Sequence, residues 1–300
     1  MVANEPIVVG VDGSEGSAVA VGWAARTAAH RKLPLRIVAI VHVPAAFYAE
    51  PYIADQHRDA LVRAGRERIE TAAVAARQAA ADLGEIDVTG EVYEGKATQR
   101  LVEQSESAWM IALGARGHGE ISAMAVGSTA SSVAAHAACP VVVVRGRLHE
   151  GLPPTSGPIA VGVDGSPLSQ AAVEFAFEAA SARGAPLTAV HVWSDVRMPA
   201  LIGGGSDEGH WKTVQEREEG VLVERLAEFV ERFPDVEVAR VVARDRPVRV
   251  LSELSERAQL IVVGSRGRGG FTGMLMGSTS NALMHTADCP VVVVRPRKQK

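Results

Sequence analysis

The sequence is poor in cysteine, in aromatic residues and in long apolar runs. Two cysteines in 300 residues provide no disulfide framework, which excludes the small disulfide-rich secreted folds. Aromatic residues make up only 4%, so we expect an aliphatic core. No apolar run reaches the roughly 18 residues of a membrane-spanning helix. Residues 1–6 include Glu5 and lead straight into an apolar run, unlike a secretory signal. These absences predict a cytoplasmic protein without an integral membrane segment.

The sequence also lacks an excess of basic residues. Lysine and arginine number 31 against 35 acidic residues, and the net charge is −4. This argues against a nucleic-acid partner, which needs a basic face to neutralise phosphates. A content of 47% hydrophobic and 22% charged residues is typical of a globular protein. At about 150 residues per domain, the length predicts two domains.

The two expected domains are copies of one another. The segment VGVDGS at residues 9–14 returns at 161–166, and CPVVVVR at 139–145 returns letter for letter at 289–295. Matches in the same order, separated by 150 to 152 residues, indicate a duplicated domain. We therefore predict domains at 1–147 and 156–300. Residues 146–157 are rich in proline, glycine and serine and are interpreted as a linker.

Each copy alternates short apolar runs with longer helical patterns. Residues 6–11 form an unbroken apolar run, as expected of a strand that is buried on both faces. The next residues, 17–31, are rich in alanine and are typical of a helix. The alternation of strand and helix patterns continues to the end of each copy. The pattern predicts two tandem copies of a five-stranded parallel α/β sandwich, a Rossmann-like fold.

Two features of each copy follow strands whose carboxyl ends form the ligand-binding edge in such sheets. The first is an aspartate after the first strand, Asp12 or Asp164. The second is a glycine-rich stretch after the fourth strand, with the spacing Gly-2x-Gly-9x-Gly-Ser at 114–128 and again at 264–278. Glycines let backbone N–H groups approach an anion closely, and a helix start adds further N–H donors. The arrangement predicts a nucleotide with its sugar at the first strand and its phosphates at the glycine-rich stretch.

Each feature also has a structural interpretation. Gly-Ser before a helix is a common cap, and Asp-Gly-Ser after a strand is a common turn. Other nucleotide and hydrolase motifs are missing from the sequence, which has no P-loop, no dinucleotide-binding glycine pattern after the first strand and no Gly-x-Ser-x-Gly elbow. His136 and Cys139 have metal-ligand spacing, but the second copy has Thr286 in place of the histidine, so we interpret them as structural.

The glycine spacing, together with Val-Asp-x-Ser at the end of the first strand, resembles the ATP-binding class of the universal stress protein family. The resemblance covers nearly the whole chain and both copies, and it is similar to the two-domain members of mycobacteria and related actinobacteria. It implies the strand order 3-2-1-4-5 and one ATP per domain, with Mg²⁺ accompanying the nucleotide.

The resemblance also implies roles for individual residues. Backbone groups of Val41 and Val190 would meet adenine, Asp195 would join the second site, and Asp12 and Asp164 would face the adenosine. Gly10 and Gly162 would let the adenosine approach. The phosphates would be held in the first copy by Gly114, Ala115, Arg116, Gly117, His118, Gly119, Glu120, Gly127, Ser128 and Thr129, and in the second by Gly264, Ser265, Arg266, Gly267, Arg268, Gly269, Gly270, Gly277, Ser278, Thr279 and Ser280.

The two copies differ where the phosphates would lie. His118 and Glu120 of the first copy stand where the second has Arg268 and Gly270. An anion in place of a small neutral residue, and the loss of a cation, predict a weaker first site.

The sequence favours a nucleotide-dependent regulator of stress response or growth, because the motif supplies no obvious general base beside the γ-phosphate. Two alternatives remain: a slow ATPase or nucleotidyl-transferring enzyme that uses the same cleft, and a scaffold whose cleft stays empty. The apolar final strands at 141–145 and 291–295 are expected to pair with each other or to support a homodimer.

Overall fold

The computed structural model describes residues 5–42, 51–115, 126–148, 151–193, 208–267 and 275–295, with only the backbone described at 51–54 and 208–212. The chain divides into two compact units between Pro153 and Pro154, inside the predicted linker. We describe the two units separately, as domain 1 and domain 2. The linker contacts both domains. Leu152 lies against Gly22 in domain 1, and in domain 2 the Gln259 side chain donates a hydrogen bond of 2.7 Å to the Gly157 carbonyl.

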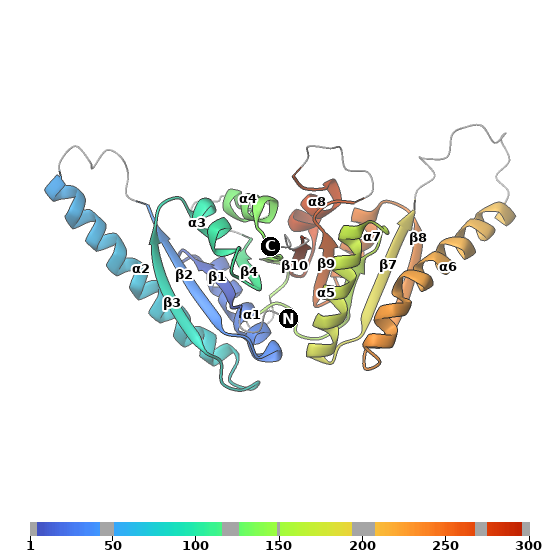
Figure 1. Cartoon of the computed structure of the whole chain (residues 1–300), viewed down its shortest axis with the longest axis horizontal. Coiled ribbons are helices and arrows are strands. Elements are labelled where there is room, and N and C mark those ends of the chain that lie inside the picture. Colours follow the sequence, from blue (N-terminus) through green and yellow to red (C-terminus); the bar gives the residue numbers. More distant parts are fainter. Residues whose placement is uncertain are drawn as a thin grey trace. The chain divides into compact units, whose positions relative to one another are not determined.

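Strands and helices alternate through both domains, as the apolar runs predict (Figure 1). Domain 1 consists of β1 (Ile7–Val11), α1 (Glu15–Arg31), β2 (Leu35–Val41), α2 (Pro51–Ala79), β3 (Val88–Glu94), α3 (Ala97–Gln104), β4 (Met110–Gly114), α4 (Ser128–His136) and β5 (Val141–Val144). Domain 2 consists of β6 (Ile159–Gly162), α5 (Pro167–Arg183), β7 (Leu187–Trp193), α6 (Glu208–Arg232), β8 (Val238–Arg244), α7 (Pro247–Ser255), β9 (Leu260–Gly264), α8 (Ser278–Thr286) and β10 (Val291–Val294).

All strand pairs within each domain are parallel. The order is β3-β2-β1-β4-β5 in domain 1 and β8-β7-β6-β9-β10 in domain 2, which confirms the expected order 3-2-1-4-5. In this order the first and fourth strands are neighbours, so the aspartate and the glycine-rich stretch leave the sheet side by side.

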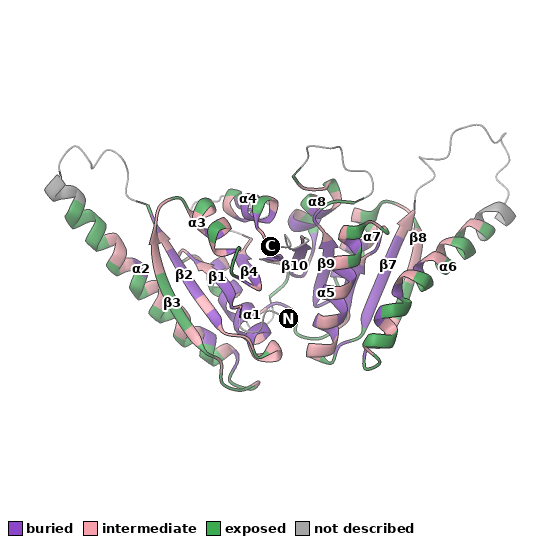
Figure 2. Cartoon of the chain, in the orientation of Figure 1, coloured by how far each residue is buried: buried purple, intermediate pink, exposed green. Residues whose placement is uncertain are grey.

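The core of each domain is mainly aliphatic and lies on both faces of its sheet (Figure 2), although domain 1 also buries Trp23 and domain 2 buries Phe175, Phe177 and Phe229. The central strands are almost fully buried, and the four valines of β5 and of β10 are all inaccessible or nearly so. In domain 1, α1 and α2 pack together on one face while α3 and α4 pack together on the other. Helices on both faces explain why the central strands read as unbroken apolar runs. Among the described helices, none is long and apolar enough to cross a membrane.

Candidate functional site

The aspartate after the first strand organises the start of the following helix. In domain 1 the Asp12 Oδ1 accepts hydrogen bonds from the Ser14 N–H at 2.9 Å and from the Ser14 hydroxyl at 2.6 Å. The Ser14 hydroxyl in turn caps α1 by accepting from the Ser17 N–H. Asp164, Ser166 and Ser169 repeat these contacts in domain 2. The interpretation of Asp-Gly-Ser as a turn is therefore correct. Its serine also caps the helix, and the turn fixes the position of the carboxylate.

The helices after the glycine-rich stretches begin differently. The N-cap residues of α4 and α8 are Gly127 and Gly277, which have no side chain that could accept a hydrogen bond from the first turn. The first N–H groups of such a helix carry the positive end of its dipole and are suited to hold an anion. In domain 1 the exposed Ser128 and the half-buried Thr129 stand at this end. A phosphate could take the place of the missing cap.

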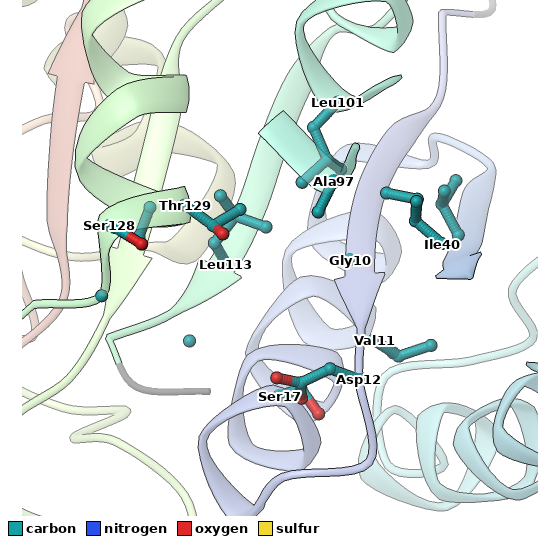
Figure 3. Close-up of a pocket in the computed structure, with 14 residues that line it drawn as sticks. Gly10, Val11, Asp12, Ser17, Ile40, Ala97, Leu101, Leu113, Ser128 and Thr129 are labelled. Carbon is teal, nitrogen blue, oxygen red and sulfur yellow. The ribbon is translucent and has the colours of Figure 1, made fainter. Parts of the chain in front are cut away.

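In domain 1 both features open into one cavity of about 210 Å³ (Figure 3). Its polar lining is formed by Asp12 and Ser17 on one side and by Ser128 and Thr129 on the other, and Gly10 of β1 also lines it. The structure thus brings together residues from the two ends of domain 1 that the sequence assigned to one site.

The cavity also has an apolar wall, which sequence reasoning missed. Val38 and Ile40 of β2, Ala97 and Leu101 of α3, and Leu113 of β4 line it. The spacing holds a signal that could have found them, because residues two apart on a strand share a face and residues four apart on a helix share a side. A wall of this kind suits a flat apolar group such as a purine base.

Val41 and Val190, the two residues assigned to adenine, lie at different positions on their strands. Gly10 pairs with Val38 and Gly162 pairs with Val190, so Val190 corresponds to Val38 and not to Val41. The side chain of Val41 faces Gly65 of α2, on the opposite side of the sheet from the cavity. The Val41 carbonyl accepts the Gly95 N–H at 2.9 Å. The two valines therefore do not occupy equivalent positions, because Val41 ends β2 as Trp193 ends β7. The role of their backbone groups toward adenine stays a prediction.

Several glycines of the motif have a packing role of their own. A Cβ on Gly114 would collide with the backbone of Gly16, at the start of α1. A Cβ on Gly10 would lie 2.8 Å from the end of the Leu113 side chain. Gly114 needs to be glycine because β4 packs tightly against the backbone of α1, whether or not a ligand is present, whereas at Gly10 the Leu113 side chain could move.

In domain 2 the first and fourth strands are again neighbours, but Ser280 and Ser265 are buried at the candidate site. The Ser280 side chain is 3% exposed and its hydroxyl donates a 2.6 Å hydrogen bond to the Gly264 carbonyl. A phosphate contact was expected of this serine, but its hydroxyl holds α8 to the end of β9. Ser265 is also buried, whereas Arg266, Gly267 and Ser278 are exposed.

Other predicted site residues have described backbone positions at the same edge. Ala115 follows β4 and donates its N–H to the Val144 carbonyl, while its own carbonyl accepts the Gly127 N–H. Thr279 occupies the second position of α8, as Thr129 does in α4. Outside the described residues lie Arg116, Gly117, His118, Gly119, Glu120, Asp195, Arg268, Gly269 and Gly270.

The described residues contain no group of three or more histidine, cysteine, aspartate or glutamate side chains suited to a metal ion. His136 is exposed and its Nδ1 lies 2.8 Å from the Ser132 carbonyl of its own helix, whereas Cys139 is buried.

Fold and site together define a tandem pair of parallel α/β domains with a capped aspartate turn facing an uncapped helix N-terminus. Comparison with known proteins gives the family. The model of the universal stress protein family matches residues 3–145 and 156–295. The chain therefore belongs to the universal stress protein family, with two family domains in tandem.

Curated relatives extend over both domains. The chain is 42% identical over 294 residues to universal stress protein Rv2005c of Mycobacterium tuberculosis, covering 96% of each chain. It is 40% identical over 293 residues to universal stress protein Rv2623 of the same organism, again covering 96% of each. Among solved structures, a universal stress protein from Archaeoglobus fulgidus DSM 4304 matches with a TM-score of 0.69 at 19% identity, over 98% of this chain and 99% of that one. That similarity shows the fold.

Proposed function

We propose that this chain is a nucleotide-dependent regulator that binds one ATP in each domain and carries out no fast chemistry. The observation that carries the proposal is the domain 1 cavity, which joins an apolar wall, a fixed carboxylate and an uncapped helix N-terminus. These three surfaces match the three parts of a nucleoside triphosphate. The glycine spacing that resembles the ATP-binding class supports the same assignment in domain 2.

The three parts of the nucleotide have separate partners in domain 1. The base would lie against Val38, Ile40 and Leu101, where apolar area is available for burial. The ribose hydroxyls would donate to the Asp12 carboxylate. The phosphates would accept hydrogen bonds from the first N–H groups of α4 and from its hydroxyl side chains. When bound, Mg²⁺ would neutralise phosphate charge.

The cavity favours binding over turnover. Within its described lining, Asp12 is the only ionisable side chain, and its Oδ1 already accepts two hydrogen bonds from Ser14. A carboxylate held in this way, at the sugar end of the site, is poorly placed to activate water at the γ-phosphate. The output of the protein would then depend on nucleotide occupancy.

Nucleotide bound to freshly purified protein tests the proposal. Mass spectrometry of the heat-released small molecules should identify ATP. Added Mg-ATP at about 100-fold excess over Kd should stabilise the fold by about 2.7 kcal/mol in thermal unfolding. Absence of nucleotide together with an unchanged melting temperature would favour the empty scaffold. Sustained phosphate release well above background would favour the ATPase.

The two sites can be separated by substitution. Asp164→Ala should abolish more of the ATP-induced stabilisation than Asp12→Ala, because the second site is proposed to bind ATP more tightly. The second copy has Arg268 and Gly270 where the first has His118 and Glu120. Equal losses in the two variants would contradict the proposed difference between the sites.

A further inference from the structure

A buried histidine lies beneath the aspartate turn of domain 2. His191 of β7 is 4% exposed. Its Nδ1 lies 2.6 Å from the carbonyl oxygen of Val163, the residue before Asp164. Its Nε2 lies 3.0 Å from Glu218 Oε2, on α6. The imidazole therefore connects the turn that carries the site aspartate to a helix on the other side of the ring.

Domain 1 has no such connection at the equivalent position. Register places Val11 opposite Ala39, and the same spacing in domain 2 places Val163 opposite His191. Strand β1 includes Val11, whereas β6 ends one residue earlier, at Gly162. The two domains therefore differ just before the aspartate, where domain 2 adds a ring nitrogen as a partner of the carbonyl.

The two contacts of His191 fix how many protons the pair must hold. A backbone carbonyl only accepts, so Nδ1 donates to Val163. The contact between Nε2 and Glu218 needs one further proton, carried either by the imidazole or by the carboxyl. Loss of that proton leaves a nitrogen lone pair facing a carboxylate at 3.0 Å, which is repulsive in a buried place. Histidine is the side chain whose charge ordinarily changes near neutral pH.

Among the described residues, the neighbouring elements offer no other titratable partner to the His191 ring, so the contact between Nε2 and Glu218 is the one that depends on a proton. On the β8 side the register partner of His191 is the apolar Val242. Helix α5 begins with Pro167, Leu168 and Ser169, all uncharged. Of the charged groups, Asp164 follows Val163 directly, and the guanidinium of Arg225 on α6 covers Gly165. Helix α6 thus contacts the aspartate turn twice, through Glu218 with His191 and through Arg225.

We infer that His191 is a positioning residue that makes the domain 2 nucleotide site, and not the domain 1 site, sensitive to protons. With the shared proton present, α6 holds the Val163–Asp164 backbone in the geometry that presents the carboxylate to the nucleotide. Once the proton is lost, Glu218 repels the ring, so α6 no longer holds the turn through His191, although Nδ1 still donates to the Val163 carbonyl. The inference rests on the proposed nucleotide binding, but the state of the pair can be measured without nucleotide.

The first measurement uses the full chain without nucleotide. Nitrogen-15 NMR of the histidine rings across about pH 5.5 to 8.5 should show His191 with a protonated Nδ1 throughout and a change at Nε2. Glu218→Gln keeps a hydrogen-bonding partner for Nε2 in either state and removes the carboxylate. It should change the Nε2 signal of His191 and leave the ring signals of His136, an exposed histidine in domain 1, unchanged. A His191 resonance that titrates identically in wild type and Glu218→Gln would overturn the inference.

The second measurement follows nucleotide affinity against pH. In the Asp12→Ala background, which isolates domain 2, affinity for a fluorescent ATP analogue should fall by about fivefold or more as the pH rises through the His191 titration. Glu218→Gln should flatten this profile, and His136→Ala should leave it unchanged. In the Asp164→Ala background, which isolates domain 1, affinity should not show this fall with rising pH.

The outcomes separate the two proposals. Nucleotide binding with one and the same pH profile in both backgrounds would overturn the role of His191 while leaving the proposed function intact. Failure of the analogue to bind at any pH would instead overturn the proposed function. His191→Ala, which reproduces the alanine of domain 1, should bind more weakly at low pH without a pH-dependent step.

Discussion

Asp164 and Gly267 are in direct contact in domain 2: the carboxylate Oδ2 lies 2.5 Å from the position that a Cβ on Gly267 would occupy. The glycine-rich stretch after β9 therefore folds back onto the aspartate that follows β6. Because Ser166 holds the other carboxylate oxygen through two hydrogen bonds, the carboxylate cannot turn away freely. Glycine at position 267 is what allows the two halves of the predicted site to meet.

Gly267→Ala should therefore weaken nucleotide binding in domain 2. The added methyl group would push the Asp164 carboxylate away from its hydrogen bonds with Ser166, so we expect affinity to fall by about tenfold, a free-energy change of about 1.4 kcal/mol. Titration of the Asp12→Ala background with a fluorescent ATP analogue measures the change. The control is Gly220→Ala on α6, where a Cβ meets nothing within 4 Å. It should leave affinity unchanged and stabilise the helix by about 1 kcal/mol. Equal affinities in both variants would contradict the proposed contact.

Gly114→Ala should destabilise domain 1 even without nucleotide. The new Cβ would collide with the backbone of Gly16, and overpacking against backbone costs about 1–3 kcal/mol. The equivalent Gly264→Ala should cost less, because its Cβ would lie 3.1 Å from the Leu168 backbone. Hydrogen exchange of the amides in β4 and β9 reports each domain separately. A larger loss in domain 2 would contradict the packing role assigned to Gly114.

Ser280→Ala should lower stability but not nucleotide affinity. The buried hydroxyl donates to the Gly264 carbonyl, and the loss of such a bond costs about 1 kcal/mol. Domain 1 has the buried Ala130 at this position, so Ala130→Ser is the reciprocal variant for stability. Because Ala130 also lines the domain 1 cavity, the affinity comparison is confined to Ser280→Ala. Thermal unfolding and analogue titration check both expectations. A clear loss of affinity in Ser280→Ala would restore the phosphate role expected from the sequence.

Loss of the ion pair between Arg26 and Asp82 should lower the stability of domain 1 in acid. Arg26 of α1 reaches Asp82 through two hydrogen bonds of 2.6 and 3.0 Å and also donates to the Ala79 carbonyl. The hydrogen bond from Arg26 lowers the pKa of Asp82 below its ordinary value of 3.8. A carboxyl with a lowered pKa in the folded state contributes stability above its unfolded pKa and loses it as the pH falls through the folded pKa.

Asp82→Asn should accordingly reduce the dependence of stability on pH in the acid range while changing it little at neutral pH, because the pair is near the surface. Urea unfolding at a series of pH values, followed by hydrogen exchange in α1, provides the measurement. Glu85→Gln, at an exposed residue nearby, serves as the control and should retain the wild-type profile. If both variants behave alike, the Arg26 contact is not the cause.

Much of the fold could be predicted because its determinants are local. The unbroken apolar runs of β1 and β5 predict buried parallel strands, and the alternation with helical patterns predicts the α/β class. Boundaries were less certain. The helix expected at 17–31 begins instead at Glu15, after the Ser14 cap, since helix ends depend on caps and packing as well as on propensity. The strand order came from the family resemblance, and the observed pairing agrees with it.

The candidate site was predictable in outline for the same reason. Asp12 with its Ser14 cap and Gly127 at the start of α4 are short-range patterns, visible in a few consecutive residues. The apolar wall was missed because Val38 and Leu101 become neighbours only when α3 packs on β2. The register that makes Val190 the counterpart of Val38 has the same origin. Val41 lies three residues further along β2, an odd number that places its side chain on the opposite face of the strand.

By itself, the sequence determined that this protein is two copies of one α/β domain, each with an aspartate turn and a helix that begins after a glycine at the same edge of its sheet. Those features depend on residues close together in the chain. Tertiary structure alone decided that the Ser280 hydroxyl donates to the Gly264 carbonyl, that Gly267 contacts Asp164, and that His191 lies between Val163 and Glu218. These are contacts between distant segments, and their geometry depends on how helices pack on a sheet, which no local pattern of residues specifies.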